Sequence, residues 1–371
     1  MQYRAIKTKL KVNDCQATLM AQHAGLGRWV WNWALRLWEE AYKVGLKPNA
    51  AKLKKLFTNH IKPQHEWMNG LSSRVYQYAF QHLGEAFNRF FKGLAKYPNF
   101  KKKGLHDSFT LDATPRQIKL TGVRHKLPVI GWVRTHETLA ECQTKKVTIS
   151  READGWYLSF HIEFEPKETC KNREIVGVDL GINSLATLSS GIVFPNLKPY
   201  RSALKRLAKL QRNVSRKTTG SKNRAYAITK LARQHQRVAN IRKDALHNIT
   251  SYLAKNHGTV VIEDLHIAGM LKNHPLAQSI ADVAFGEFRR QLEYKCQWYG
   301  AKLLVVSRFF PSSQLCSGCG YQQKMPLHVR TFDCRECGLS INRDLNASIN
   351  LENAAGYVVS ASRRGAADSP G

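Results

Sequence analysis

The 371-residue sequence has no long apolar run and few acidic residues. No stretch approaches the roughly 20 apolar residues of a membrane-spanning helix, and residues 1–12 lack the apolar core of a signal peptide. These absences exclude an integral membrane protein and predict a soluble, intracellular one. Only 27 Asp and Glu stand against 58 Lys and Arg, so the formal net charge is +31. Such self-repulsion favours a polyanionic partner, above all nucleic acid. An anionic membrane surface is disfavoured, because no basic amphipathic anchor or lipidation signal is present.

The eight cysteines divide into two groups. Four are scattered, as expected of buried or unreactive thiols in a reducing compartment. The other four form the pattern Cys316-x2-Cys319-x14-Cys334-x2-Cys337, and a glycine follows each pair. Two such pairs let four thiolates converge tetrahedrally on Zn²⁺, with no position left open, so the pattern predicts a structural zinc site. A pair of disulfides is the alternative, which an intracellular chain disfavours.

The first half of the chain predicts helices followed by a sheet. Residues 15–97 carry apolar residues at helical spacing, and a basic loop at 96–103 ends this block. Trp29, Trp31, Trp33 and Trp38 could stack on nucleobases, but aromatic stripes at this spacing favour helix packing. Residues 147–164 alternate strictly around an Asp-Gly turn, which predicts a hairpin, and residues 1–12 fit another strand of that sheet.

The second half predicts short buried strands separated by helices. Strands are expected at 175–180, 185–189, 192–194, 259–263 and 302–307, and an amphipathic helix at 282–298. Residues 201–243 hold 14 Lys or Arg and no acid, largely at helical periodicity. A charge run is often only a solvated face, but fourteen uncompensated positive charges favour contact with phosphates. Residues 354–371 lack periodicity and are expected to be disordered.

Three acids occupy unusual positions along this second half. Asp179 lies inside an apolar strand, Glu263 ends another, and Asp344 opens the last helix. Any one of them could be a helix cap or an ion-pair partner. Their order is the one that an RNase H-like sheet uses to gather carboxylates around two Mg²⁺ ions, which prefer oxygen ligands.

The motifs around these acids resemble a known family. Gly177-Val-Asp-Leu-Gly181, Ile262-Glu-Asp-Leu265 and Asn342-Arg-Asp-Leu-Asn-Ala-Ser348 resemble the three RuvC motifs of the TnpB family. These are transposon-encoded RNA-guided DNA endonucleases related to type V CRISPR effectors. Residues 307–320 resemble the entry to the family's zinc ribbon, and the similarity runs to about Asn353. Many relatives have an acid where this chain has Asn342.

The resemblance implies an enzyme of a prokaryotic insertion sequence that cleaves target DNA by two-metal-ion phosphodiester hydrolysis at one RuvC-like site. The target would be chosen by a guide RNA from the transposon end and by a short motif in double-stranded DNA that the protein recognises. Asp179, Glu263 and Asp344 would be the catalytic ligands of two Mg²⁺ ions, for which Mn²⁺ can substitute, beside one structural Zn²⁺. The resemblance further implies a cytoplasmic, nucleoid-associated protein with no small-molecule substrate and no membrane partner.

The expected fold is multidomain, combining α+β and α/β parts. A wedge-like β-barrel would comprise residues 1–14 and 98–170, with a helical recognition domain inserted at 15–97. An RNase H-like, RuvC-like nuclease domain would comprise 171–310 and 339–353, with a zinc ribbon inserted at 311–338. Candidate nucleic-acid contacts, chosen for their charge or their ability to pair with base edges, are Ser73, Arg74, Gln77, Lys101, Lys102, Lys103, Arg206, Arg212, Arg216, Lys217, Arg237 and Arg242.

Two other functions fit part of the pattern. A conventional transposase would join strands as well as cut them, but it uses an Asp-Asp-Glu site, whereas the third acid here is Asp344. A catalytically silent, zinc-containing nucleic-acid-binding regulator would be favoured by the loss of any one acid, and all three are present.

Overall fold

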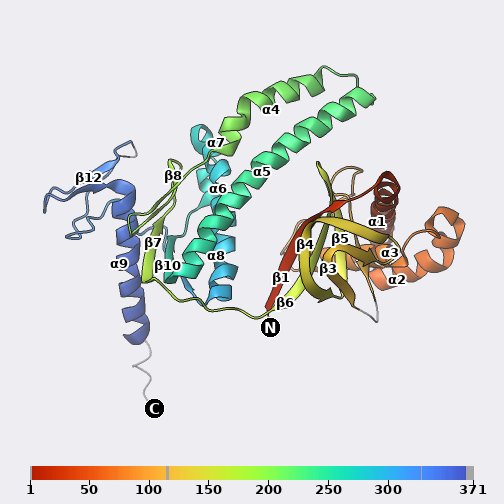
Figure 1. Ribbon diagram of the computed structural model, residues 1–371, viewed down its shortest axis with the longest axis horizontal. Helices are drawn as coiled ribbons and strands as arrows, with labels where there is room; N and C mark the ends of the chain where they lie inside the picture. Colours follow the sequence, from red (N-terminus) through yellow and green to blue (C-terminus); the bar gives the residue numbers. More distant parts are fainter. Residues whose placement is uncertain (1, 114–116, 327, 365–371) are drawn as a thin grey trace, which may run out of the picture. The chain divides into compact units, whose positions relative to one another are not determined.

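The computed structural model describes residues 2–113, 117–326 and 328–364, and the chain separates into two units, Met1–Glu165 and Pro166–Gly371. Each unit has its own hydrophobic core and is described by itself (Figure 1). None of the helices in the described ranges is long and apolar enough to cross a membrane.

The first unit combines an antiparallel sheet with a helical segment. Its elements are β1 (Gln2–Lys11), α1 (Asp14–Lys43), α2 (Ala50–Leu56), the short turns η1 (Phe57–Ile61), η2 (Lys62–Gln64) and η3 (Glu66–Met68), α3 (Ser73–Phe91), β2 (Ser108–Asp112), β3 (Ile118–Leu127), β4 (Gly131–Thr144), β5 (Lys146–Glu152) and β6 (Gly155–Phe164). The six strands lie in the order β2-β5-β6-β1-β4-β3. The predicted hairpin is β5–β6, and the first residues form β1, which pairs along β6, so both predictions are confirmed.

The predicted β-barrel is confirmed in part, because the six strands form a half-barrel. Strands β2 and β3 are its two edges, and no pairing joins them among the residues that the structure describes. Helices α1 and α3 pack against β2 instead. A helix that covers an edge strand protects it from further pairing, so this edge does not require closure by another strand.

Helix α1 begins and packs as its sequence dictates. Asn13 and Gln16 form a capping box at its start, with side chain to backbone distances of 2.8 and 3.2 Å. Trp31 and Trp38 are each only 8 % exposed, and Trp38 stacks on Phe87 of α3 at 4.1 Å between ring centroids. The expectation that the tryptophans serve packing is therefore confirmed for these two.

The second unit is built on a mixed sheet with helices on both faces. Its elements are β7 (Arg173–Asp179), β8 (Ser184–Leu188), β9 (Val193–Pro195), α4 (Pro199–Ser215), α5 (Lys222–Asn256), β10 (His257–Glu263), α6 (Ile267–Met270), α7 (His274–Val283), α8 (Phe285–Tyr299), β11 (Lys302–Val306), β12 (Thr331–Asp333), β13 (Ser340–Asn342) and α9 (Arg343–Arg364). The five main strands lie in the order β11-β10-β7-β8-β9. Strands β7, β10 and β11 pair in parallel, whereas β8 pairs antiparallel with both β7 and β9.

Alternation along β7 and β10 assigns their side chains to two faces. Val176, Val178, Val260 and Ile262 pack in the core that contains residues of α5 and α8. The intervening Val261 packs with residues of α9 on the opposite face. Figure 1 shows α9 on one side of this sheet and α5 and α8 on the other.

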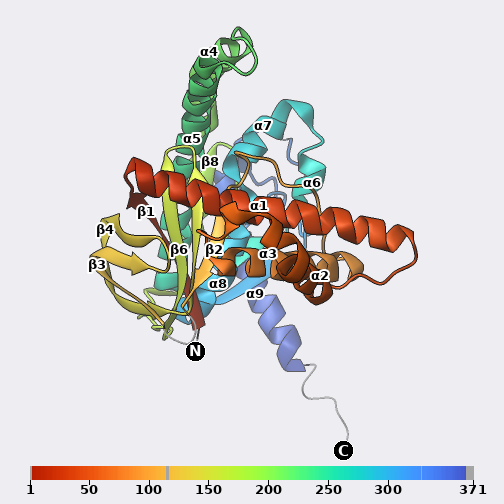
Figure 2. The ribbon, with the colours of Figure 1, turned by 90° about the vertical axis from the view of Figure 1, so that its right-hand side faces the viewer.

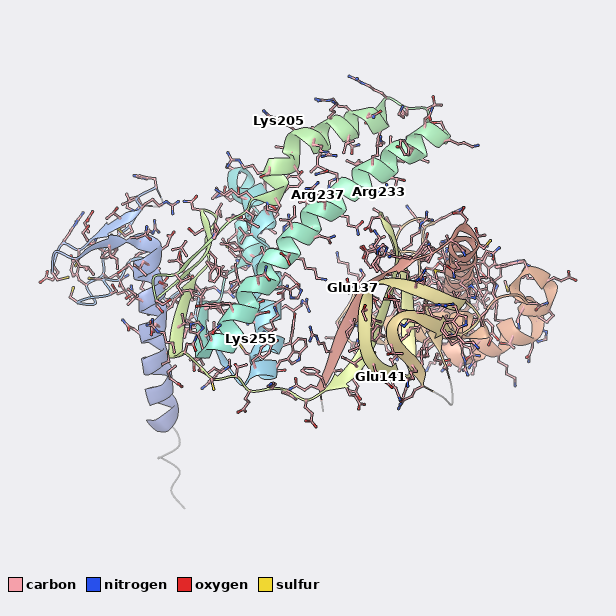
Figure 3. All side chains as sticks on the ribbon, viewed as in Figure 1. Glu137, Glu141, Lys205, Arg233, Arg237 and Lys255 are labelled. Atoms are coloured by element: carbon pink, nitrogen blue, oxygen red, sulfur yellow. The ribbon has the colours of Figure 1, made fainter. Side chains whose placement is uncertain are left out.

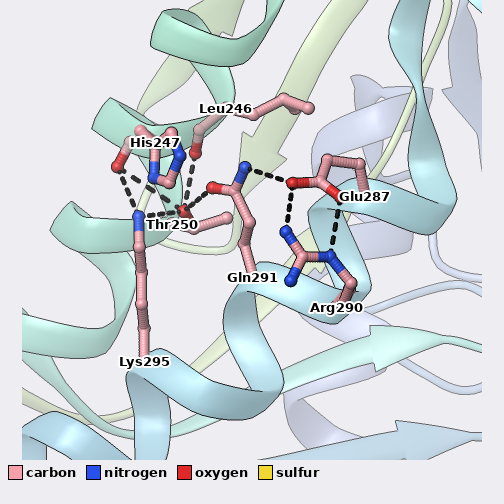
Figure 4. A network of polar contacts seen from close by, with 7 residues as sticks. All are labelled: Leu246, His247, Thr250, Glu287, Arg290, Gln291 and Lys295. Atoms are coloured by element: carbon pink, nitrogen blue, oxygen red, sulfur yellow. Dashed lines mark hydrogen bonds and ion pairs between the residues drawn. The ribbon is translucent and has the colours of Figure 1, made fainter. Parts of the chain in front are cut away.

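Helices α5 and α8 are joined by a buried polar network (Figure 4). The ammonium group of Lys295, a residue only 4 % exposed, donates to the carbonyl of His247 at 2.8 Å and to the hydroxyl of Thr250 at 2.7 Å. Thr250 also contacts the side-chain oxygen of Gln291 at 2.9 Å. A buried cation is tolerated only when its donors are satisfied, so this network fixes the two helices in one register.

Helices α4 and α5 form an antiparallel hairpin that extends away from the sheet (Figure 2). Ala203 and Leu207 of α4 meet Val238 of α5 in a small apolar seam. Asp282 of α7, only 5 % exposed, pairs with Arg242 at 2.7 Å and accepts the Tyr200 amide at 3.1 Å. This buried carboxylate therefore joins the bases of α4 and α5 to α7.

Two helix predictions need correction. The expected helix at 282–298 is interrupted at Ala284, whose φ of 58° separates α7 from α8. The expected disordered tail begins inside α9, which continues to Arg364, while residues 365–371 lie outside the described residues. Ala354 and Ala355 are buried against β10 and β11, because small side chains permit a close approach of helix to sheet. Such residues carry little periodic signal of their own.

The contact between β7 and α9 depends on Gly177. A methyl group at this position would overlap the carbonyl oxygen of Ser348 and lie 2.6 Å from the amide nitrogen of Glu352. Both obstacles are backbone atoms and cannot rotate away. The absence of a side chain at Gly177 is what allows the helix to lie directly on the strand.

We therefore expect Gly177→Ala to destabilise the second unit by about 3 kcal/mol or more, at the upper end of overpacking effects. That corresponds to a fall of roughly 10 °C in its thermal unfolding midpoint. Gly286→Ala is the matched control, because its methyl group would meet only the Ile267 side chain, at 3.4 Å, within a helix. Unfolding midpoints that are equal for the two variants would contradict the close approach.

Candidate active site and metal-binding cysteines

Three carboxylates gather at one end of the second unit's sheet. Asp179 is the last residue of β7 and Glu263 the last residue of β10. The register pairs Ile262 with Val178, so the two acids that follow are neighbours across parallel strands. Alternation places Asp179 on the same face as Gly177, toward α9. Asp344 lies in the first turn of that helix.

Burial and the neighbouring acids both raise the pKa of Asp179. The pKa of Asp179 is raised to about 7, first by burial and then by the negative charges of Asp344 and Glu263. Burial also raises the pKa of Glu263, opposed by a hydrogen bond with Ser312. Mutual repulsion of this kind disfavours full ionisation at neutral pH, and a nearby cation would relieve it.

The donor set fits hard divalent cations, which prefer carboxylate oxygens. The three acids are not, however, as closely gathered as the cysteines. Among the residues that the structure describes, the four cysteines are the only group of three or more Cys, His, Asp or Glu whose ligand atoms lie close enough to share one ion. The assignment of Asp179, Glu263 and Asp344 to Mg²⁺ therefore stays a prediction.

Asn342 caps the start of the helix that carries Asp344. Its side-chain oxygen accepts the backbone amides of Asp344 at 3.0 Å and Leu345 at 3.1 Å, which makes it the cap of α9. An amide oxygen and a carboxylate oxygen serve this role equally well. The side chain of Asn342 therefore holds the backbone of Asp344 in position.

The neighbouring Asp264 has a different environment. Its carboxylate pairs with Arg289 of α8 at 2.8 Å and with Arg308 of the loop after β11. The hydrogen bond from Arg308 is the main reason that the pKa of Asp264 lies below its ordinary value. Both of its oxygens are engaged by guanidinium groups, so this acid holds structure together beside Glu263.

Two asparagines that sequence reasoning did not single out connect the acidic site to the cysteines. Asn346 donates to the carbonyl of Leu315 at 2.6 Å and accepts the amide of Ser317 at 2.9 Å. Asn350 donates to the carbonyls of Ser312 and Leu315, both at 2.8 Å. Two asparagines four residues apart lie on one face of a helix, and this spacing is the signal that could have revealed them.

The four cysteines are arranged for one metal ion. Their sulfur atoms all lie within 4.8 Å of one another, and the pairs Cys316–Cys337 and Cys319–Cys334 are each 3.6 Å apart. Four thiolates at about 2.3 Å from a tetrahedral Zn²⁺ would be about 3.8 Å apart, so the cluster fits this ion. Gly320 and Gly338, which end the two pairs, have φ angles of 77° and 73° that favour glycine.

The candidate nucleic-acid contacts of α3 are mostly engaged within the protein. Arg74 pairs with Asp112 at 2.8 Å and donates to the Gln77 side chain at 3.1 Å. Tyr78 donates to the other oxygen of Asp112. Ser73 is the exposed first residue of the helix. That these residues contact base edges stays a prediction. Arg74 would have to break its ion pair with Asp112 before it could make such a contact.

The basic loop after α3 is anchored to α1. Lys101 exchanges two backbone hydrogen bonds with the Asn32 side chain, at 2.7 and 2.9 Å. Its ammonium group lies 4.0 Å from the centroid of the Trp31 ring. Lys102 and Lys103 are exposed beside it. Their role as nucleic-acid contacts stays a prediction.

The helical hairpin presents most of its candidates to solvent. Arg206, Arg212, Arg216 and Arg237 are exposed and Lys217 is half-buried; Figure 3 marks Arg237 on α5. Arg242, by contrast, is engaged in the ion pair with Asp282.

Three family models match the chain. Residues 159–274 match a model described as "Probable transposase", residues 285–351 a "Cas12f1-like, TNB domain", and residues 1–47 a "Helix-turn-helix domain". In this structure the last of these ranges contains a strand, β1, followed by the single long helix α1.

Similar proteins are found over nearly the whole chain. A Streptomyces pristinaespiralis protein named "Putative RNA-guided DNA endonuclease" is 40 % identical, over 96 % of this chain and 90 % of its own length. An Escherichia coli K12 protein of the same description, InsQ, is 34 % identical over 96 % and 93 %. Among solved structures, the cryo-EM structure of the Cas12f1-sgRNA-target DNA complex matches with a TM-score of 0.57 and 15 % identity, covering 92 % of this chain and 84 % of that one, which shows a shared mixed α/β multidomain fold. The chain therefore belongs to the TnpB family that its motifs indicate.

Proposed function

We propose that this protein is an RNA-guided DNA endonuclease of a prokaryotic insertion sequence. The observation that supports the proposal is that Asp179 and Glu263 end neighbouring parallel strands, Asp344 lies in the first turn of α9, and the charges of Asp344 and Glu263 act on Asp179. The names of the two bacterial relatives support the same activity. We assign the second unit to the RNase H-like, RuvC-like class on its strand order and on these acids.

Each acid is held by a different part of the fold. Asp179 is fixed by the pairing of β7 with β8 and β10, Glu263 by its hydrogen bond with Ser312, and Asp344 by the cap of α9. Two Mg²⁺ ions bound there would activate water and stabilise the leaving 3′ oxygen of the DNA strand. The protein's part is to hold the oxygen ligands in fixed geometry.

The partners that we propose are a guide RNA and a double-stranded DNA target. The net charge of +31 and the exposed arginines of α4 and α5 supply a surface for phosphates. Pairing between guide and target would select the sequence, while the protein would recognise a short DNA motif.

Conservative changes of the three acids test the catalytic assignment. Asp179→Asn, Glu263→Gln and Asp344→Asn should each reduce Mg²⁺-dependent DNA cleavage by about a thousandfold or more, and double variants should lose little further, because the ligands act as a unit. Binding of the copurified RNA should be retained, since the carboxylates offer nothing attractive to an anion. Cleavage and RNA content would be measured on the same preparations.

The matched control is Glu352→Gln. Glu352 is another acid of α9, and it forms an ion pair with Arg173 at 2.8 Å instead of belonging to the three-acid site. Its cleavage rate should stay close to that of the wild type. Cutting that ignores the RNA sequence would refute guidance, and joining of strands would favour a transposase. If the wild type cuts under no divalent metal, the protein is a binding protein.

The hairpin assignment is tested through the salt dependence of binding. Replacing Arg206, Arg212 and Arg216 by Gln should weaken nucleic-acid binding for all sequences alike and flatten the slope of log K against log salt by about 2 to 3, because fewer counterions are released. Replacing the same three by Lys keeps the charge and should preserve the slope. A Gln variant with the wild-type slope would leave the hairpin as a solvated face.

We also propose that the cysteine cluster binds one structural Zn²⁺. Cys316→Ser or Cys334→Ser should lose about one equivalent of zinc by elemental analysis and expose the second unit to protease, because metal binding supplies folding free energy. Cys170→Ser, at an exposed cysteine outside the cluster, is the control and should retain both properties. Complete zinc loss with unchanged protease resistance and thermal stability would contradict a structural role.

A further inference from the structure

A hollow of about 970 Å³ opens along one side of α1 in the first unit. Four aromatic rings line it: Trp29 and Trp33 from α1, Trp67 from η3 and Phe100 from the loop after α3. Trp67 is 51 % exposed and Phe100 is 48 % exposed, although large apolar rings are usually covered. The hollow belongs to neither the acidic site nor the cysteine cluster, which lie in the other unit.

The walls of this hollow are held in place by contacts within the unit. The ring of Trp29 meets that of Trp67 edge to face, with centroids 6.4 Å apart and an interplanar angle of 84°. Asn32 holds the backbone of Lys101 through two hydrogen bonds, and Phe100 is the residue before it. Rings fixed in this way offer contact area at little further cost in conformational entropy.

The hollow also offers polar groups of one kind. Arg36 lines it, is exposed, and has no ion pair or hydrogen bond among the described residues. Among the residues that the structure describes, the indole N–H groups of Trp29, Trp33 and Trp67 have no hydrogen-bond acceptor. The indole of the buried Trp31, by contrast, donates to a backbone carbonyl at 3.0 Å. No acidic side chain is among the described residues that line the hollow. The site therefore combines ring faces, hydrogen-bond donors and a free positive charge.

We propose that this hollow binds an unpaired base of single-stranded RNA, which stacks on Trp67 or Phe100 while Arg36 contacts its phosphate. Single-stranded RNA is bound by stacking of splayed bases on aromatic side chains and by hydrogen bonds to their edges. In a duplex the base faces are already stacked, and only their edges reach the grooves. This inference rests on the proposed RNA-guided function, in which RNA is the partner that carries unpaired nucleotides.

A proline-rich peptide is the main competing occupant, because aromatic grooves also bind such segments. The absence of acids, the unpaired Arg36 and the net charge of +31 favour a ligand that carries phosphates. The packing role predicted from sequence holds for Trp31 and Trp38, which are buried, and for Trp29 and Trp33, which pack against the same core but are only partly buried and also line this hollow.

The test compares variants at one exposed tryptophan with a matched control in the same unit. Trp67→Ala should weaken the binding of the end-labelled copurified RNA, and of a single-stranded uridine 20-mer, by about 5- to 100-fold, the effect of losing one stacked base. Trp67→Phe keeps a ring and should restore most of the affinity. Trp132→Ala removes a tryptophan of similar exposure, 55 %, on β4 and should change neither affinity.

Arg36→Gln keeps the inference testable if Trp67→Ala fails to fold, because Arg36 makes no contact that the described fold requires. This variant should weaken the binding of both RNAs and reduce the salt slope of that binding by about 0.7.

Unchanged RNA affinity in Trp67→Ala and Arg36→Gln, with guided cleavage intact, would refute the hollow as an RNA site and leave the proposed function standing. Loss of affinity for a thymidine 20-mer alone would assign the hollow to DNA, and loss for a proline-rich peptide alone would assign it to protein, so either refutes the inference. A wild-type protein that copurifies with no RNA and binds neither RNA would refute both.

Discussion

The close approach of α9 to β7 is the constraint on which the candidate site depends. Gly177 leaves room for the backbone of Ser348 and Glu352, so the helix lies directly against the strand. Asp179 is two residues beyond Gly177 on the same face, and Asp344 is one helical turn before Ser348. The two acids are 165 positions apart in sequence, and they come to the same side of the sheet because no side chain separates β7 from α9. Glu263 joins them through the parallel pairing of β10 with β7.

The same helix connects the acids to the cysteines. Asn346 and Asn350 hold the loop that leads to Cys316, and Ser312 of that loop bonds with Glu263. Asn346, Asn350 and Ser312 therefore help to determine where the acids and the cysteines lie. This is the arrangement expected when ligand geometry is set by supporting hydrogen bonds. A metal in the cysteine cluster would stabilise a loop that also contacts Glu263, an acid of the candidate site.

Charge is distributed unevenly between structure and surface. The acids are few, and several are engaged by arginines: Asp264 by Arg289 and Arg308, Asp282 by Arg242, and Asp112 by Arg74. Of the acids of the candidate site, Asp344 lies 3.9 Å from Arg330, while the pKa of Asp179 is raised by burial and by the charges of Asp344 and Glu263. Arg206, Arg212 and Arg216 of the hairpin are exposed instead. Thus an arginine that forms an ion pair inside the fold has a structural role, and an exposed arginine is the better candidate for contact with nucleic acid.

Sequence alone determined the features that are local. Cysteine spacing, strand alternation, the turn between β5 and β6, and the position of each acid at a strand end or helix start are set by residues a few positions apart. Tertiary structure decided the rest. Whether the sheet closes depends on whether its edge strands β2 and β3 pair. Whether Ala354 belongs to a tail or a core depends on the sheet beneath it, and whether Arg74 is free depends on Asp112. The hollow beside Trp67 likewise exists only because η3 and the loop of Phe100 meet α1. Side-chain availability is a property of packed neighbours, which local periodicity does not encode.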